Sequence, residues 1–153
     1  MKSKTIALIP ARGGSKRLEN KNLLLFGDKP LLAHSILYAQ ANSDIIDSVY
    51  VSTNDPAIKE CALQYGAQVI DRPDALSNDD EPTITALQHA LTSLSTLAKN
   101  VVLLQPTNPL RPEHLLREAF EIYEYDKKDS LFTVTRNYHK LGKINADTFT
   151  PFN

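Results

Sequence analysis

The sequence predicts an α/β fold, a doubly wound and mostly parallel sheet with helices on both faces. Short apolar blocks alternate with helical patterns along the chain, an order that favours parallel strands joined by helices. The strand blocks are continuous apolar runs, as in Ile6–Ile9, which is typical of strands covered on both faces. With 153 residues, 42% hydrophobic and 23% charged, the chain is expected to form a single domain over residues 1–153.

The first predicted strand, Ile6–Ile9, ends at Pro10, which has no N–H to donate to a strand ladder. A helix is expected to open near Pro30, where a missing N–H is harmless. Its inward-facing side chains are expected to be Leu32, Ala33, Ile36, Leu37 and Ala39.

The second predicted strand is Val49–Thr53, and a helix follows it at once. Asp55 suits the N-cap position and Pro56 the first helical turn, and Gly66 is expected to end this helix. A short third strand is expected over Ala67–Ile70.

A third helix is expected to open at Pro82 and a fourth at Pro112. Between them Val101–Leu104 is the most hydrophobic block, so we expect it to be a central strand. Leu131–Thr135 is the fifth predicted strand, and Asn137–Asn153 has no settled periodicity. The expected inward faces are Ile84, Leu87, Leu91 and Leu94 on the third helix, and Leu115, Leu116, Ala119, Phe120 and Tyr123 on the fourth.

The loop that follows the first strand concentrates positive charge. The basic residues Arg12, Lys16, Arg17 and Lys21 lie there with the single acid Glu19, although the whole chain has a net charge of −1. The pair of glycines at positions 13 and 14 allows backbone N–H groups to turn toward an anion. The pattern fits a polyphosphate site or a solvated basic loop equally well. It matches neither GxxxxGK[ST] nor GxGxxG.

Two further polar segments follow predicted strands, Ser52–Asp55 and Gln105–Arg111. In doubly wound sheets ligands bind outside the carboxyl ends of the strands, so these segments and the basic loop are expected to converge on one crevice. Arg111 is a second possible cation for a ligand, or a surface residue that caps a helix. Gln105 offers an amide to a ligand, or a hydrogen bond that anchors its own loop.

Composition excludes several classes of protein. A pI near 6.4 without a long basic tract argues against a nucleic-acid partner, and no apolar run is long enough for a membrane span, so a cytoplasmic location is expected. The single cysteine, Cys61, fits the buried face of a helix. The four histidines are scattered and form no zinc motif.

Five segments occur in an order that resembles a known family. They are ARGGSKRLENKN, PLLAHSI, VYVSTND, YGA at 65–67 and LLQPTNPLR, and they resemble the acylneuraminate cytidylyltransferases, or CMP-sialic acid synthetases, and more distantly their 3-deoxy-octulosonate relatives. The resemblance implies the Rossmann-like architecture of nucleotide-diphospho-sugar transferases. Family members extend further, so the fold is expected to be incomplete at the C-terminus.

The resemblance also implies roles for residues of the basic loop. Arg12 and Lys16 are expected to contact the phosphates of CTP, while Lys21 and Asn22 close the loop over the nucleotide and Ser15 supports it. Arg12, Lys16 and Lys21 are the expected catalytic residues, because they neutralise charge on the phosphates.

The remaining substrate contacts are expected further along the chain. By resemblance, Thr83 lies near the cytidine and Gln105 at the sugar-acid side, and His139 stands where the family tends to have histidine. Arg17–Glu19 departs from the family's usual small-apolar-proline run, so we expect altered loop rigidity there.

If the family's reaction holds, the anomeric hydroxyl of a nine-carbon nonulosonic acid attacks the α-phosphorus of CTP and pyrophosphate leaves. The family uses Mg²⁺, whose ligands we do not find in this sequence, and a homodimer is possible. Asp79 and Asp80 precede a helix and are expected to cap it. The alternatives are an inactive nucleotide-binding module of the same family and a related sugar nucleotidyltransferase.

Overall fold

The structure, a computed structural model, describes residues 4–15, 18–78, 81–94, 97–136, 142–145 and 148–152. The chain forms two compact units, Met1–Arg117 and Glu118–Asn153, which we describe separately. Among the described residues, no helix has both the length and the apolar character that a membrane span needs.

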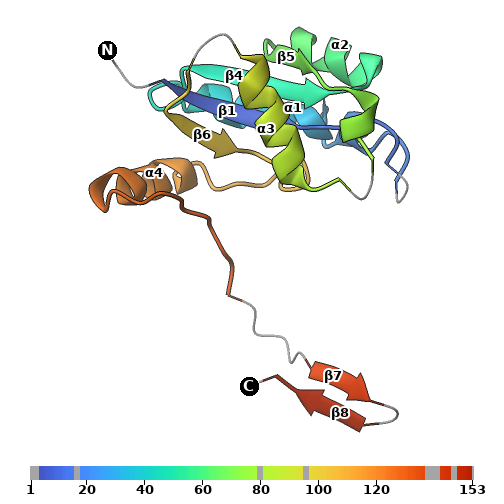
Figure 1. The fold of residues 1–153 in the computed structure, drawn as a ribbon, viewed down its shortest axis with the longest axis vertical. Helices are drawn as coiled ribbons and strands as arrows, with labels where there is room; N and C mark the ends of the chain where they lie inside the picture. The colour runs from blue at the N-terminus through green and yellow to red at the C-terminus, as the bar shows by residue number, and fades with distance from the viewer. Residues whose placement is uncertain are drawn as a thin grey trace. The chain divides into compact units, whose positions relative to one another are not determined.

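The first unit is built on a four-stranded parallel sheet (Figure 1). Its order is β5 (Gln68–Asp71), β4 (Ser48–Thr53), β1 (Thr5–Pro10) and β6 (Asn100–Leu103). The chain steps outward from β1 to β4 and β5, and then crosses to the other side of β1 to form β6. Strand order therefore reverses between β1 and β6, as in a doubly wound sheet, and the predicted fold class is confirmed.

Side chains of β1 point alternately into two hydrophobic cores. Ala7 and Ile9 pack with Leu32 and Ile36 in one core, whereas Leu8 belongs to the other. The helices α1 (Leu31–Ala41) and α2 (Pro56–Gln64) supply the first core, and α3 (Thr83–Ser93) supplies the second. Each large aliphatic side chain buried in this way contributes ~1.5–3 kcal/mol. Helices thus cover both faces of the sheet, as predicted.

The helix α2 has the ends that the sequence predicts. The Asp55 carboxylate accepts hydrogen bonds from the backbone N–H groups of Ala57 at 2.8 Å and Ile58 at 3.0 Å, and Pro56 opens the helix. Gly66 follows the helix with a φ of 77°, a left-handed conformation that disfavours a Cβ. Cys61 is buried on the core face, as predicted.

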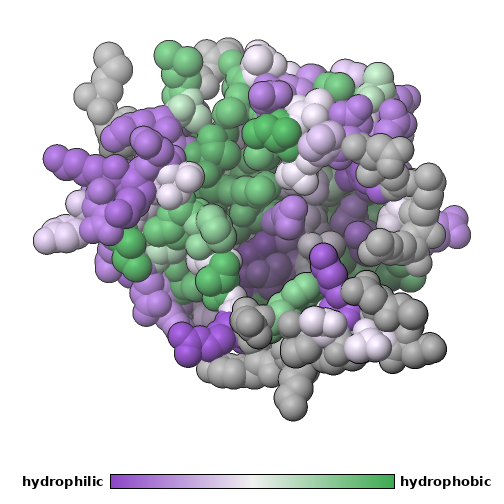
Figure 2. All heavy atoms as spheres, turned by 60° about the horizontal axis from the view of Figure 1, so that its bottom comes forward, coloured by the Kyte–Doolittle hydropathy of each residue, from purple (hydrophilic) through white to green (hydrophobic). Residues whose placement is uncertain are grey.

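The prediction that Val101–Leu104 forms a central strand is wrong for the sheet that the described residues form. There β6 pairs with β1 alone and lies at the edge, and its Val101 and Leu103 are 38% and 41% exposed. The hydrophobic pattern of a strand does not reveal how many strands pair with it. Figure 2, which brings the lower side of Figure 1 forward, shows hydrophobic side chains gathered over a broad part of the visible face.

The inward face predicted for α3 is partly wrong. Ile84 and Leu91 are 55% and 40% exposed, whereas Ala86 and Ala90 are buried. Leu87 and Leu94 are half-buried against the second core, as expected. The helix lies on the sheet through its small residues, which allow a closer approach than the leucine stripe would. In α1 the predicted face holds except at Leu37, which is half-exposed.

Two short elements lie between β1 and α1, around the turn at Gly27–Asp28 that the sequence also indicates. A 3₁₀ turn, η1 (Lys21–Leu23), is followed by a hairpin of β2 (Leu25–Phe26) and β3 (Lys29–Pro30). Gly27 turns the hairpin with a φ of 69°. The strands are too short to show a hydrophobic period, so only the glycine could have indicated them.

The helix α4 (Leu115–Tyr125) starts after a turn in which the Leu115 N–H donates to the Pro112 carbonyl. Leu116 is buried in the first unit, and Ala119, Phe120 and Tyr123 are half-buried in the second.

The prediction of a strand over Leu131–Thr135 is wrong. These residues form no ladder and their side chains are exposed, because an apolar run becomes a strand only where a neighbour supplies hydrogen bonds. Within residues 137–153, β7 (Gly142–Asn145) and β8 (Thr148–Pro151) form an antiparallel hairpin.

Candidate functional site

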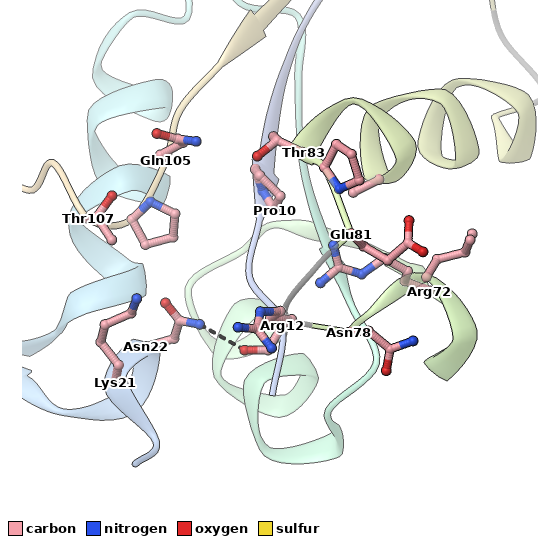
Figure 3. Close-up of a pocket in the computed structure, with 14 residues that line it drawn as sticks. Pro10, Arg12, Lys21, Asn22, Arg72, Asn78, Glu81, Thr83, Gln105 and Thr107 are labelled. Atoms are coloured by element: carbon pink, nitrogen blue, oxygen red, sulfur yellow. Dashed lines mark hydrogen bonds between the residues drawn. The ribbon is translucent and has the colours of Figure 1, made fainter. Parts of the chain in front are cut away.

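A pocket of about 230 Å³ opens at the carboxyl ends of β1 and β6, where strand order reverses. Five residues expected from the sequence line it: Arg12, Lys21, Asn22, Thr83 and Gln105 (Figure 3). They come from the loop after β1, from η1, from the start of α3 and from the loop after β6. The structure therefore brings together side chains that lie up to 93 positions apart in the sequence. Their individual contacts with a ligand stay predictions.

Asn22 stabilises the basic loop through a hydrogen bond between two of its residues. Its side-chain Nδ2 donates to the backbone carbonyl of Arg12 at 3.1 Å, the contact drawn in Figure 3, and the residue is buried. The Arg12 Nη1 donates to the carbonyl of Ser77 at 3.4 Å. Both contacts fix the position of Arg12 in the pocket wall.

The glycine at position 13 lets the loop approach α2 closely. Its N–H donates to the Asn54 Oδ1 at 3.0 Å. A Cβ added to Gly13 would lie 2.6 Å from the Asp55 Oδ2, so no larger residue fits without moving the N-cap of α2. The segment after β4 thus contacts the loop through Asn54 and Asp55 and is not part of the pocket lining.

Ser15 is the one expected site residue of the basic loop that the structure describes outside the pocket lining. It is half-buried. Lys16 and His139 lie outside the described residues, as do Arg17, Asp79 and Asp80. Their expected roles stay predictions.

Arg72 is the most informative residue that the sequence analysis missed. It lines the pocket, is only 7% exposed, and its Nε and Nη2 have no hydrogen-bond partner. Burial, and secondarily the positive charge of Arg12, lower the pKa of Arg72. Burying a charged group without partners is unfavourable, so this side chain is ready for an acceptor group on a ligand. Its place directly after β5 is the signal that could have identified it.

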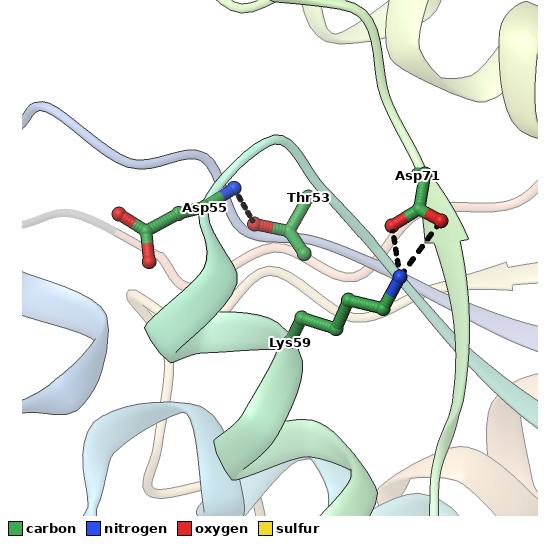
Figure 4. Close-up of polar contacts among 4 residues, drawn as sticks. All are labelled: Thr53, Asp55, Lys59 and Asp71. Atoms are coloured by element: carbon green, nitrogen blue, oxygen red, sulfur yellow. Dashed lines mark hydrogen bonds and ion pairs between the residues drawn. The ribbon is translucent and has the colours of Figure 1, made fainter.

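The backbone holds Arg72 in place. Its N–H donates to the Thr53 carbonyl at 2.8 Å, which extends the pairing of β4 with β5 by one residue. Beside it, the Lys59 Nζ lies 2.6 and 2.8 Å from the two carboxylate oxygens of Asp71 (Figure 4). Both side chains of that ion pair are largely exposed, so it contributes only ~0–1 kcal/mol. The strand ladder, more than the ion pair, fixes Arg72.

Arg111 is not part of the pocket lining, and its guanidinium contacts α1 and the Gln105 backbone. Its Nη1 donates to the Ser35 Oγ at 3.1 Å and its Nη2 to the Gln105 carbonyl at 2.7 Å, and its guanidinium lies 5.6 Å from the Tyr38 ring centroid. Burial lowers the pKa of Arg111. The structure gives Arg111 a contact that positions Gln105, and its direct contact with a ligand stays a prediction.

The charge of the pocket favours an anion. Arg12, Lys21 and Arg72 contribute positive charge, and Glu81 is the acid among the lining residues. Asn78 and Thr107 add polar groups that the sequence analysis did not single out. Three converging cations suit the phosphates of a nucleotide.

Among the described residues, no group of three or more histidine, cysteine, aspartate and glutamate side chains could hold a metal ion. Because Mg²⁺ is often held by one or two carboxylates together with substrate phosphates, the Mg²⁺ that the family resemblance implies stays a prediction.

Comparison with known proteins identifies the family. Residues 6–148 match the family model described as cytidylyltransferase. The chain belongs to the cytidylyltransferase family. It is 40% identical over 138 residues to the N-acylneuraminate cytidylyltransferase of Escherichia coli O18:K1:H7, covering 90% of this chain and 32% of that protein. It is 39% identical over 136 residues to the pseudaminic acid cytidylyltransferase of Campylobacter jejuni 81-176, covering 86% and 58%.

A solved structure agrees with this membership. CMP:2-keto-3-deoxy-manno-octonic acid synthetase complexed with CTP superposes with a TM-score of 0.70 at 26% identity, over 82% of this chain and 49% of that one. This cytidylyltransferase chain thus spans well under two thirds of the length of each of these three relatives.

Proposed function

We propose that the pocket binds CTP and that the protein transfers CMP from CTP to a nonulosonic, sialic-acid-like sugar acid. The observation that carries this proposal is the pair of arginines, Arg12 and Arg72, which face one pocket with like charges and leave buried donors of Arg72 unpaired. A polyphosphate would satisfy both. The names of the related enzymes, which act on N-acylneuraminate and pseudaminic acid, support the choice of acceptor.

The proposed reaction is an in-line displacement at phosphorus. The anomeric oxygen of the sugar acid forms a bond to the α-phosphorus, the bond from that phosphorus to the bridging oxygen of the β-phosphate breaks, and pyrophosphate leaves with the electron pair. The proton of the anomeric hydroxyl passes to solvent. No protein nucleophile takes part, and Cys61 is buried in the core.

The protein contributes position and charge. Arg12 and Lys21 line the pocket as cations and are proposed to bind the phosphates, where they stabilise charge that grows on the leaving group. Thr83 at the start of α3 is proposed to face the cytidine, and Gln105 after β6 the sugar acid. Arg111 is proposed to act through Gln105, whose carbonyl it binds.

A second candidate is a module that binds nucleotide without turnover. The three cations that line the pocket favour binding of a nucleotide's phosphates, and this binding does not by itself require turnover. In this case CTP binds more tightly than inorganic tripolyphosphate, but no pyrophosphate is released.

The deciding experiment measures pyrophosphate release from CTP by the folded 153-residue chain, with Mg²⁺ and a panel of nonulosonic acids. We expect release that depends on one acid and is lost when UTP or GTP replaces CTP. Tight CTP binding without release would favour the binding module, and equal use of UTP would favour a related sugar nucleotidyltransferase. CTP affinity no better than that of tripolyphosphate would refute both cytidine-specific proposals.

A further inference from the structure

The side-chain amide of Asn54 links the loop after β1 to the segment after β5. It follows β4 and is half-buried. Its Oδ1 accepts a hydrogen bond from the Gly13 N–H at 3.0 Å, and its Nδ2 donates to the Asp74 Oδ1 at 3.0 Å. The same amide therefore accepts a hydrogen bond from the loop after β1 and donates one to the segment after β5.

Each side of this bridge leads to an arginine of the pocket. Gly13 directly follows Arg12. Asp74 opens η2 (Asp74–Leu76), two residues after Arg72. At the end of the same segment, the Ser77 carbonyl accepts a hydrogen bond from the Arg12 Nη1. The bridge thus connects the backbones that carry the two guanidinium groups.

The positive charges of Arg12 and Arg72 do not favour the closeness of their two guanidinium groups. The charge of Arg12 disfavours the protonated form of Arg72, so the like charges repel each other. The strand ladder and the contacts of Arg12 position each backbone, and the Asn54 amide adds a link from the loop that carries Arg12 to the segment that follows Arg72. Both hydrogen bonds of Asn54 are of ordinary length at 3.0 Å, so the amide joins the loop after β1 to the segment after β5.

We propose that Asn54 is a positioning residue that holds the Arg12 loop and the Arg72 segment at the spacing required to bind a polyphosphate. It touches no ligand itself, because it is not part of the pocket lining. The proposal rests on the proposed function only in that the pocket receives a polyphosphate. Such preorganisation raises affinity by removing the need to order the site on binding.

The chemistry of the amide suggests a double-mutant cycle. Asn54→Asp keeps an acceptor for Gly13 but sets a carboxylate against Asp74, so the bridge breaks. Adding Asp74→Asn places an amide donor at position 74 opposite the carboxylate at position 54. The hydrogen bond can then form again, with its direction reversed. The double variant also has the net charge of the unchanged protein, which separates bridge formation from a general effect of charge.

The experiment measures tripolyphosphate affinity by calorimetry on the whole 153-residue chain, after thermal unfolding has shown that each variant is folded. We expect Asn54→Asp to weaken binding roughly tenfold, which corresponds to ~1.4 kcal/mol. The double variant should return to within about twofold of the unchanged protein, and Asp74→Asn alone should change little. The neutral variant Asn54→Ala should also weaken binding, without adding a charge.

Three outcomes would overturn the proposal: additive effects in the cycle, unchanged affinity in Asn54→Ala, or a loss confined to thermal stability. No measurable tripolyphosphate binding by the unchanged protein would overturn it too. CTP is titrated in parallel, because its preference over tripolyphosphate tests the proposed function alone. If that preference is absent and the cycle still shows coupling, the proposed function fails while the role of Asn54 stands.

Discussion

The guanidinium of Arg111 donates to the backbone carbonyl of Gln105 across 2.7 Å and ties the loop after β6 to α1. The other end of this link is Ser35, a fully buried residue of α1 whose hydroxyl accepts from the same guanidinium. The Tyr38 hydroxyl reinforces the link, because it donates to the Pro112 carbonyl and accepts from the Leu116 N–H.

Replacing Arg111 is therefore expected to destabilise the fold. Arg111→Ala removes charge-assisted hydrogen bonds and leaves the Ser35 hydroxyl without this donor, so the free energy of unfolding should fall by ~1–3 kcal/mol. Unfolding in urea measures this change in the free energy of unfolding. Arg117→Ala is the matched control, because Arg117 pairs with Asp44 in an exposed ion pair and its loss should change stability by less than ~1 kcal/mol. Equal losses in both variants would contradict the prediction.

Arg72→Met is expected to change stability and affinity in opposite directions. The substitution removes a buried charge whose Nε and Nη2 lack partners and which Arg12 repels, so the free protein should be stabilised by ~1–2 kcal/mol. It also removes a donor for the ligand, so CTP should bind more weakly. Thermal unfolding with and without CTP measures both effects. A variant that loses stability and keeps its CTP affinity would show that Arg72 is a structural residue.

Arg12→Ala is expected to weaken CTP binding by ~2–3 kcal/mol, the loss of a charge-assisted contact, with little change in stability. Calorimetric titration of CTP measures the affinity. Lys59→Ala removes the same charge from an exposed ion pair outside the pocket, and should leave affinity within about twofold. If both variants lose affinity equally, long-range attraction by positive side chains accounts for the loss and Arg12 makes no specific contact with the nucleotide.

Gly13→Ala is expected to damage the N-cap of α2. The added Cβ would lie 2.6 Å from the Asp55 Oδ2, so Asp55 must leave its capping position at a cost of ~0.5–2 kcal/mol. When Gly13→Ala is combined with Asp55→Ala, the loss of stability should be smaller than the sum of the two single losses. Gly14→Ala is the comparison: it strains a φ of 65° but meets nothing within 4 Å, so its loss should add to that of Asp55→Ala.

The buried thiol of Cys61 is expected to make stability depend on alkaline pH. Burial raises the pKa of Cys61 above its ordinary value of 9.0, so the folded protein keeps its proton at a pH where the unfolded chain ionises. Its contribution is complete below pH 9.0 and is lost as pH rises through the folded-state pKa. Urea unfolding from about pH 8 to about pH 10 should show the stability gap to Cys61→Ala shrinking. A constant gap would contradict this.

The sequence predicted the elements that short-range chemistry determines. β1, β4 and β5 are continuous apolar or β-branched blocks between clear stop signals, and Asp55 and Gly66 mark the ends of α2 through local backbone requirements. The convergence of Arg12, Lys21 and Gln105 followed from one rule about the ends of parallel strands.

The errors concern relations between distant segments. The position of β6 at the edge depends on which strands pair beside it, and the exposed run at Leu131–Thr135 lacks a partner among the described residues. Arg72 was overlooked because its importance comes from burial and from its distance to Arg12, neither of which a polar stretch of sequence displays.

The position of β1 within the sheet makes the two walls of the pocket unequal in their motions. β1 is hydrogen-bonded to a strand on each side and buried on both faces, so its amides should exchange with solvent only when the whole unit unfolds. The strand before Gln105 is bonded on one side within the described sheet, and can open at a lower free energy. Hydrogen exchange should therefore be slower in the strand before Arg12 than in the strand before Gln105, whose loop depends on the contacts of Arg111 to keep its position.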